Sequence, residues 1–209
     1  MKQIDPSRLI DMGVQDAKLR TRPVYAGPDN FLGQAIYKKN AKIWLFDDFA
    51  KIVLAAAKRS VDEYGFYFVL TDGLRTVDAQ EHMLATRRTQ ENPQWVKSQM
   101  LSKPGFGGHP RGMAVDIILE DAMGRKLDMG TELDDMSAAS ARDYADLPED
   151  VLERRHILER LMCDAAAEQD QPLLPLPGEW WDFRFPPEVY EEYAPLSDAS
   201  LPPMMRMVL

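Results

Sequence analysis

Two short segments of the sequence combine ionisable side chains with glycine or aromatic residues. The first runs from His109 to Asp116 and follows a glycine-rich loop that begins at Pro104. Asp116 lies inside an apolar run, where a carboxylate is costly unless it is paired or bound to a metal. The pattern is therefore typical of a cation site. The alternative is that Asp116 caps a turn or pairs with an arginine, and that His109 is a surface loop residue.

The second segment reads Gly-Glu-Trp-Trp-Asp-Phe-Arg-Phe over residues 178–185. It places two carboxylates, Glu179 and Asp182, three positions apart among aromatic residues. In an ideal strand these positions face opposite sides, so both reach one site only through a bulge or an irregular strand end. The alternative is an aromatic core strand whose charges lie in solvent.

A third candidate is Arg75, which follows an Asp-Gly turn after an apolar stretch. An arginine at the rigid end of a strand often points toward a cleft. Its planar fork suits a carboxylate or an oxyanion that develops during a reaction. The alternative is a surface salt bridge of little consequence.

The elements that must position these residues follow from hydrophobic spacing and turn signals. A helix is predicted to begin at Asp47 and to stop at Gly65. Strands and helices are mixed without a regular βαβ rhythm, which favours an α+β fold with a small, mainly antiparallel sheet and packed helices in a single domain. Further helices are predicted over 77–88, over 92–100 and after 148, with strands over 66–71, 114–120, 125–129 and 179–185. The first 45 residues and residues 131–146 are predicted to be irregular.

Composition excludes several classes of protein. The 209 residues carry a net charge of −9, which argues against non-specific binding to nucleic acid. One cysteine excludes an internal disulfide and a multi-cysteine metal site. No apolar run is long enough to span a membrane, and the N-terminus lacks the apolar region of a secretory signal. We therefore expect a cytoplasmic protein without a membrane partner.

Taken in order, the three motifs resemble those of the D-alanyl-D-alanine dipeptidases, the zinc enzymes of the vancomycin-resistance type. The order is Asp-Gly-x-Arg, then His-x-Arg-Gly-x-Ala-x-Asp, then Glu-Trp-Trp-x-Phe. The similarity extends to 16–18, 29–33 and 129–136, and covers about residues 14 to 195. It implies one metallopeptidase-like domain over 1–209, with 1–13 and 196–209 as peripheral tails.

The resemblance also implies a role for each matched position. It makes Glu179 the general base, Arg75 the group that stabilises the transition state, and Asp134 the carboxylate that holds the free amine of the substrate. The implied zinc ligands are His109 and Asp116, together with Asp182 at a position where the family has a histidine. A family serine falls on Gly107 and a family tyrosine on Leu19, so specificity for D-Ala-D-Ala is expected to be less strict.

The expected activity is hydrolysis of D-alanyl-D-alanine or a similar short peptide by a water that one Zn²⁺ per chain activates. Histidine nitrogen and carboxylate oxygen both bind zinc. A second carboxylate makes the ion less electrophilic and shifts the preference toward manganese or magnesium. Two alternatives stay open: a non-catalytic protein that binds a cell-wall-type peptide, and a D,D- or L,D-carboxypeptidase acting on peptidoglycan stems. The oligomeric state is left open.

Overall fold

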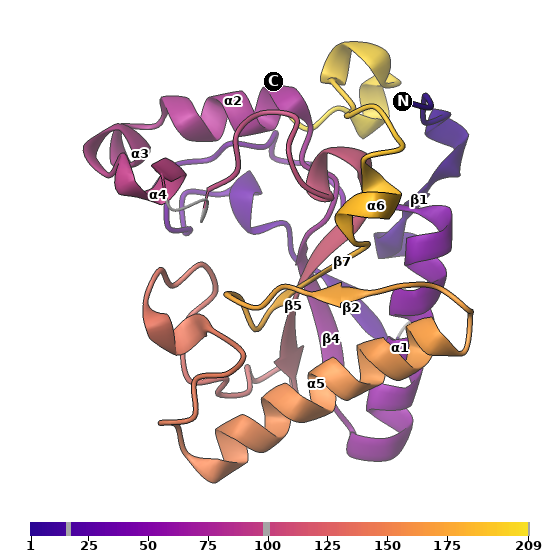
Figure 1. The fold of residues 1–209 in the computed structure, drawn as a ribbon, viewed down its shortest axis with the longest axis vertical. Coiled ribbons are helices and arrows are strands. Elements are labelled where there is room, and N and C mark those ends of the chain that lie inside the picture. Colours follow the sequence, from indigo (N-terminus) through magenta and orange to yellow (C-terminus); the bar gives the residue numbers. More distant parts are fainter. Residues whose placement is uncertain (16–17, 98–100, 209) are drawn as a thin grey trace.

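A five-stranded sheet forms the centre of the molecule. The computed structural model describes residues 1–15, 18–97 and 101–208 (Figure 1). In spatial order the strands are β2 (Leu19–Thr21), β4 (Tyr67–Asp72), β5 (Ala114–Glu120), β7 (Asp182–Arg184) and β6 (Leu174–Pro175). Only β2 and β4 pair in parallel, and the other pairs are antiparallel. The predicted α+β class with a mainly antiparallel sheet in a single domain is confirmed.

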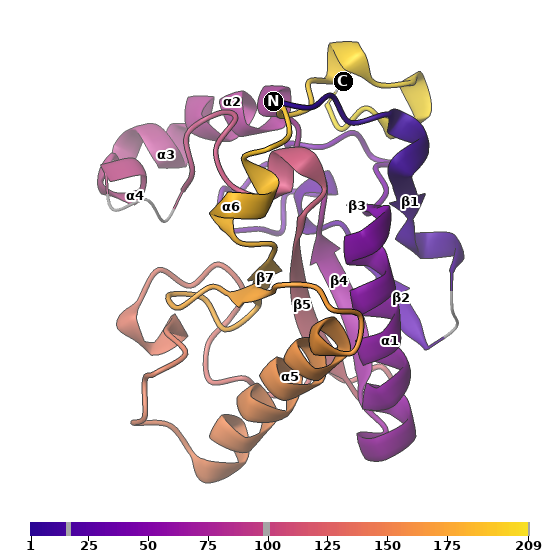
Figure 2. The same cartoon turned by 45° about the vertical axis from the view of Figure 1, so that its right-hand side comes forward.

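Two long helices, α1 (Asp47–Tyr64) and α5 (Glu149–Ala167), pack against each other beside this sheet (Figures 1 and 2). Helix α1 has the predicted bounds. Its first turn carries two aspartates, which suit the positive end of the helix dipole. It ends at Gly65, whose φ of 68° suits the left-handed cap. Its apolar side chains, including Ile52 and Val53, are fully buried.

The predicted helix over 77–88 is wrong in its extent, because it divides at Thr86. The segment forms α2 (Val77–Ala85) and α3 (Arg87–Glu91). Thr86 has extended backbone angles, and its hydroxyl accepts a hydrogen bond from the backbone N–H of Thr89, 3.2 Å away. This side chain ends one helix and caps the next. The following helix, α4 (Gln94–Lys97), begins two residues after its predicted start, and its predicted end near Met100 lies outside the described residues.

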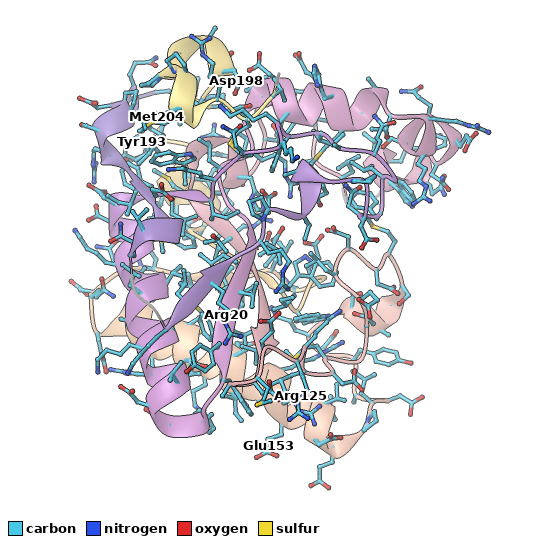
Figure 3. The ribbon with its side chains drawn as sticks, turned by 180° about the vertical axis from the view of Figure 1, so that it is seen from behind. Arg20, Arg125, Glu153, Tyr193, Asp198 and Met204 are labelled. Atoms are coloured by element: carbon cyan, nitrogen blue, oxygen red, sulfur yellow. The ribbon has the colours of Figure 1, made fainter. Side chains whose placement is uncertain are left out.

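The predicted strand over 125–129 is also wrong. Lys126 makes only an isolated bridge to Glu120. The cause is Asp121, whose carboxylate accepts hydrogen bonds from the backbone N–H groups of Met123 and Arg125 and so stabilises a turn. Glu120 is buried at the end of β5, where Arg20 of β2 reaches it at 2.7 Å (Figure 3).

The N-terminal region is more regular than expected. It contributes β2 and a second, two-stranded sheet of β1 (Leu9–Asp11) and β3 (Trp44–Phe46). Asp16 and Ala17, which the family resemblance used, lie outside the described residues. The domain assignment with peripheral tails stays a prediction. In the structure, Leu9 and Met207 from those segments are buried. A last short helix, α6 (Pro187–Tyr190), follows β7. Within the described part of the chain, no helix has both the length and the apolar character needed to cross a bilayer.

The register of the central strands brings three aspartates side by side. Asp116 of β5 is the partner of Asp182 on β7. It is also the partner of Asp72 on β4, after a shift of register at the end of that strand. Alternation along β5 turns Asp116 to the face opposite its neighbours Val115 and Ile117. All three carboxylates are buried, so each needs a partner.

Candidate active site

A cavity of about 240 Å³ lies over this row of aspartates. Its wall combines charged side chains with apolar ones such as Phe31, Leu101 and Met136. The structure brings all the site residues predicted from the sequence to this cavity: Arg75, His109, Asp116, Asp134, Glu179 and Asp182. Gly107 also lines it, whereas Leu19 is a buried residue of β2 and does not.

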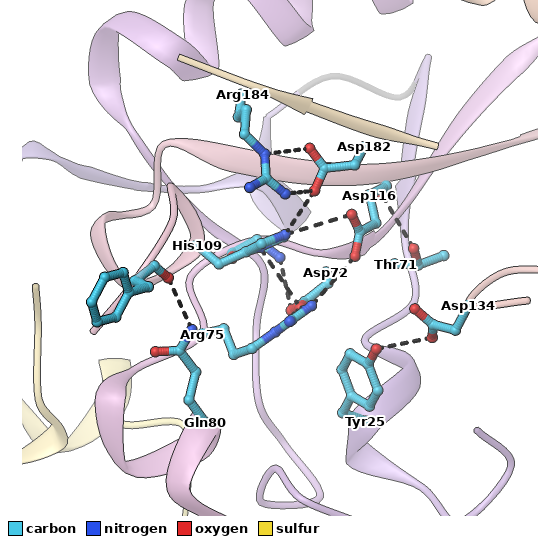
Figure 4. A network of polar contacts seen from close by, with 12 residues as sticks. Tyr25, Thr71, Asp72, Arg75, Gln80, His109, Asp116, Asp134, Asp182 and Arg184 are labelled. Carbon is cyan, nitrogen blue, oxygen red and sulfur yellow. Dashed lines mark hydrogen bonds and ion pairs between the residues drawn. The ribbon is translucent and has the colours of Figure 1, made fainter. Parts of the chain in front are cut away.

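His109 has one fixed orientation in the cavity wall. It begins a single 3-10 turn after the glycine-rich loop. Its Nδ1 donates a hydrogen bond to the carbonyl of Gly73 at 2.8 Å, so Nε2 is the nitrogen that offers a lone pair when the ring is neutral. Nε2 faces Asp182 Oδ2 at 3.2 Å and Asp116 Oδ1 at 3.6 Å (Figure 4). Burial and the charge of Arg75 lower the pKa of His109, but the two aspartates outweigh them and raise it to about 10.

Two donor-atom distances around His109 Nε2 have the spacing of ligands around one ion. Ligands about 2.1 Å from a tetrahedral centre lie roughly 3.4 Å apart, close to the 3.2 and 3.6 Å observed around His109 Nε2. Asp116 Oδ1 is buried and has no hydrogen-bond partner among the described residues. Burial raises the pKa of Asp116, although His109 opposes the shift. These residues fit a divalent cation, which would supply the missing partner of Asp116 Oδ1.

Asp72 is close enough to be considered as a ligand, because its carboxylate lies within 4.8 Å of donor atoms of His109 and Asp116. Its lone pairs are, however, already engaged. Oδ1 accepts from the Tyr37 hydroxyl at 2.7 Å and from its neighbour's backbone N–H at 2.9 Å. Oδ2 accepts from Arg75 at 2.7 Å and 2.5 Å. A carboxylate has about four acceptor sites, so we read Asp72 as the anchor of Arg75.

Asp182 differs from Asp116 because it has its own cation. Arg184 binds both of its oxygens, with Nε 2.7 Å from Oδ1. Although burial opposes ionisation, Arg184 and His109 hold the pKa of Asp182 well below its usual range. The residue is therefore ionised at neutral pH. The sequence alone did not single out Arg184. Residues two positions apart on a strand project from the same face, so the sequence could have indicated Arg184 as a partner of Asp182.

Glu179 precedes β7 in a turn, so the predicted conflict between positions 179 and 182 does not arise. Asp182 is the first residue of the strand, and the two intervening tryptophans form part of the turn. Glu179 is half-buried in the cavity wall. Burial, with Asp182 and Asp116 nearby, raises the pKa of Glu179 to about 8. A carboxyl group with this pKa exchanges its proton near pH 8, so it can both accept and return a proton in that range.

Asp134 lies in the acidic loop and faces the cavity with a left-handed backbone, φ 60°. Its Oδ2 accepts a hydrogen bond from the Tyr25 hydroxyl at 2.9 Å. Burial and the charge of Asp116 raise the pKa of Asp134 to about 7, against the effect of Arg75. The Arg75 guanidinium lies 5.3 Å from the centre of the Tyr25 ring. Tyr25 was missed because nothing in its sequence context indicates chemistry.

Comparisons with known proteins found one matching family model and related chains. The family model described as Peptidase_M15, D-ala-D-ala dipeptidase, matches residues 6–197. The chain is 29% identical over 182 residues to the D-alanyl-D-alanine dipeptidase of Escherichia coli (strain K12), covering 87% of this chain and 86% of that protein. It is also 35% identical over 86 residues to the D-alanyl-D-alanine dipeptidase of Synechocystis sp. (strain ATCC 27184 / PCC 6803 / Kazusa), covering 36% of this chain and 32% of that protein.

Proposed function

The chain belongs to the peptidase M15 family of D-Ala-D-Ala dipeptidases, and from this premise we propose that it hydrolyses D-alanyl-D-alanine or a similar short peptide with one divalent cation. The observation that carries the proposal is the buried Asp116 Oδ1, which has no hydrogen-bond partner among the described residues and lies 3.6 Å from His109 Nε2, which in turn lies 3.2 Å from Asp182 Oδ2. The cation would be held by His109, Asp116 and Asp182. The proposed resident ion is Zn²⁺, although the oxygen-rich ligands also suit manganese.

When bound, such an ion lowers the pKa of a water molecule and polarises a carbonyl group. The chain itself orients the ligands. The Gly73 carbonyl fixes the tautomer of His109, and Arg184 fixes the plane of the Asp182 carboxylate. The first contact keeps Nε2 directed at the cluster, so the ring is already oriented to bind an ion when it is neutral.

Glu179 is proposed to take the proton from the attacking water and to pass it to the leaving amine. Its place in the cavity wall beside Asp116 and Asp182 supports this role. A single carboxylate can perform both transfers in sequence because its pKa lies near the working pH.

Arg75 is proposed to bind the oxyanion that forms during the reaction, and Asp134 to bind the charged amine of the substrate. Arg75 is held rigidly by Asp72 and faces the cavity, where it would stabilise the oxyanion by about 2.7–4 kcal/mol. Asp134, oriented by Tyr25, would bind the α-ammonium group of the substrate. Because that group is present only at a free N-terminus, the arrangement selects short peptides with an unblocked amine.

The test is release of D-alanine from D-Ala-D-Ala by the zinc-loaded protein and by Glu179→Gln. We expect the variant to lose about 10²–10⁴-fold in rate while it still binds one zinc ion per chain. Glu153→Gln, at an exposed position on α5 far from the cavity (Figure 3), is the matched control and should keep full activity. Unchanged turnover in Glu179→Gln, or no metal in the loaded wild type, would contradict the proposal. A panel of N-blocked and L,D-peptides distinguishes a dipeptidase from a carboxypeptidase.

A further inference from the structure

Arg184 is a cationic side chain that bonds to both oxygens of one proposed ligand. It follows Asp182 by two positions on β7, so both side chains project from the same face of the strand. Its guanidinium bonds to both carboxylate oxygens of Asp182, and both side chains are largely buried (Figure 4). These two bonds use two of about four acceptor sites on the carboxylate. Asp182 can therefore bind Arg184 and a cation at once.

The contact between Arg184 and Asp182 changes the net charge of the proposed ligand cluster. His109 contributes a neutral imidazole when Nε2 is a ligand, and each of the two aspartates contributes −1. Arg75, which also lies 3.5 Å from Asp116, adds no net charge because it makes its two shorter contacts with Asp72 and the two charges cancel. Arg184 contributes +1, so the cluster carries −1 in total. A divalent ion then keeps a net positive charge, which it would lose if Arg184 were neutral.

We propose that Arg184 is a positioning residue that orients Asp182 and offsets its charge, so that an ion held by His109, Asp116 and Asp182 stays electrophilic. This inference rests on the proposed function. A nearby cation repels a bound ion, so Arg184 weakens metal binding. The same positive field strengthens the action of the ion on a water or carbonyl. Arg184 therefore affects affinity and turnover in opposite directions, which a purely structural contact does not do.

The experiment measures Zn²⁺ affinity by competition with a chromophoric chelator, and D-alanine release from D-Ala-D-Ala, in the full chain. Arg184→Gln keeps a hydrogen-bond donor but removes the charge. We expect it to bind Zn²⁺ about tenfold more tightly and to turn over about 10–100-fold more slowly. Arg184→Lys keeps the charge and should stay close to the wild type in affinity.

A second pair of variants tests the charge balance itself. Asp182→His replaces the ligand by a neutral one, so Arg184 is left without a countercharge and Zn²⁺ affinity should fall. Adding Arg184→Gln to Asp182→His should restore both affinity and turnover. The same arginine substitution is thus expected to slow the protein in one background and to speed it in the other. If the single variant Arg184→Gln does not fold, the comparison of Asp182→His with the double variant still decides. Recovery of Zn²⁺ affinity and turnover in the double variant supports the inference, and no recovery overturns it.

The matched control is Arg125→Gln, which breaks an exposed Arg–Asp pair of 2.7 Å with Asp121 outside the cavity (Figure 3). It should change neither measurement. If Arg184→Gln lowers affinity and turnover together, Arg184 is only a structural partner of Asp182 and the inference is wrong. The proposed function then still stands if wild-type turnover depends on Zn²⁺ and Glu179. A wild type that binds no Zn²⁺ would overturn both.

Discussion

Replacing Arg75 by methionine should separate the two tasks assigned to this arginine. Arg75 neutralises Asp72, whose side chain is completely buried, and it faces the cavity where the oxyanion is proposed to form. Methionine fills a similar volume without charge. The substitution leaves the Asp72 carboxylate with hydrogen bonds from Tyr37 and from the Gly73 backbone only.

The expected magnitude follows from burial of the pair. Removing one partner of a buried ion pair costs about 3–5 kcal/mol because the remaining charge has no counterion. Asp72→Asn combined with Arg75→Met removes both charges. Because the two residues share one network, the loss of unfolding free energy in the double variant should be smaller than the sum of the losses in the two single variants by at least about 2 kcal/mol. The loss of an oxyanion donor, about 2.7–4 kcal/mol in the barrier, should persist in both variants.

The assay compares the free energy of unfolding in urea with kcat for D-alanine release. Stability should recover from Arg75→Met to the double variant, whereas kcat should stay about 10²–10³-fold below the wild type in both. Arg75→Met with wild-type stability would show that Asp72 does not depend on this arginine. Recovery of kcat in the double variant would show that Arg75 acts only by holding Asp72.

Four further predictions follow from single contacts. Burial raises the pKa of Asp134 from 3.8 to about 7, so its contribution to stability is full below pH 4 and is lost as the pH rises through 7. Asp134→Asn carries no such charge. In urea unfolding it should therefore gain stability relative to the wild type between pH 5 and pH 8. Gly112→Ala should lower the free energy of unfolding by more than about 1 kcal/mol, because φ is 65° and the added Cβ would lie 3.1 Å from a backbone nitrogen of β3. Trp180→Phe should cost about 0.5–1.5 kcal/mol through loss of the 2.8 Å bond from its indole to the Thr131 hydroxyl, measured in the same way. A chelator should lower the melting temperature of the zinc-loaded wild type but leave Asp116→Asn unchanged.

Long elements with a complete pattern could be predicted from the sequence. Helix α1 has apolar residues at helical spacing and a glycine stop, and β5 is an apolar strand apart from Asp116 and the final Glu120, so both were placed with the observed bounds. Prediction failed where one side chain decides the local structure. The Thr86 hydroxyl divides one helix, and the Asp121 carboxylate replaces a strand by a turn. The three-residue strands β1, β2 and β3 are too short for any periodicity to be read.

Some residues of the site could be predicted from local sequence, whereas others depend on contacts between distant segments. His109, Asp116 and Glu179 lie in motifs whose residue types indicate chemistry, so the sequence could nominate them. Asp72 was read only as a turn residue, although Arg75 three positions later is its partner. Its importance follows from the pairing of β4 with β5, a contact between segments far apart in the chain. Register of this kind is decided by tertiary packing and leaves no local signal in either segment.

The row of three aspartates also bears on the order in which the molecule can be assembled. Each of the two strands that flank β5 carries its own countercharge within three residues, since Asp72 of β4 is followed by Arg75 and Asp182 of β7 by Arg184. Either strand can therefore join β5 as an already neutral unit, before the other has arrived. Contacts distant in sequence form slowly, and an ionised strand edge waiting for its partner would be repelled. Of these three described aspartates, Asp116 in the middle has an oxygen without a hydrogen bond, and the crowding of negative charge around it arises only when both neighbouring strands are in place.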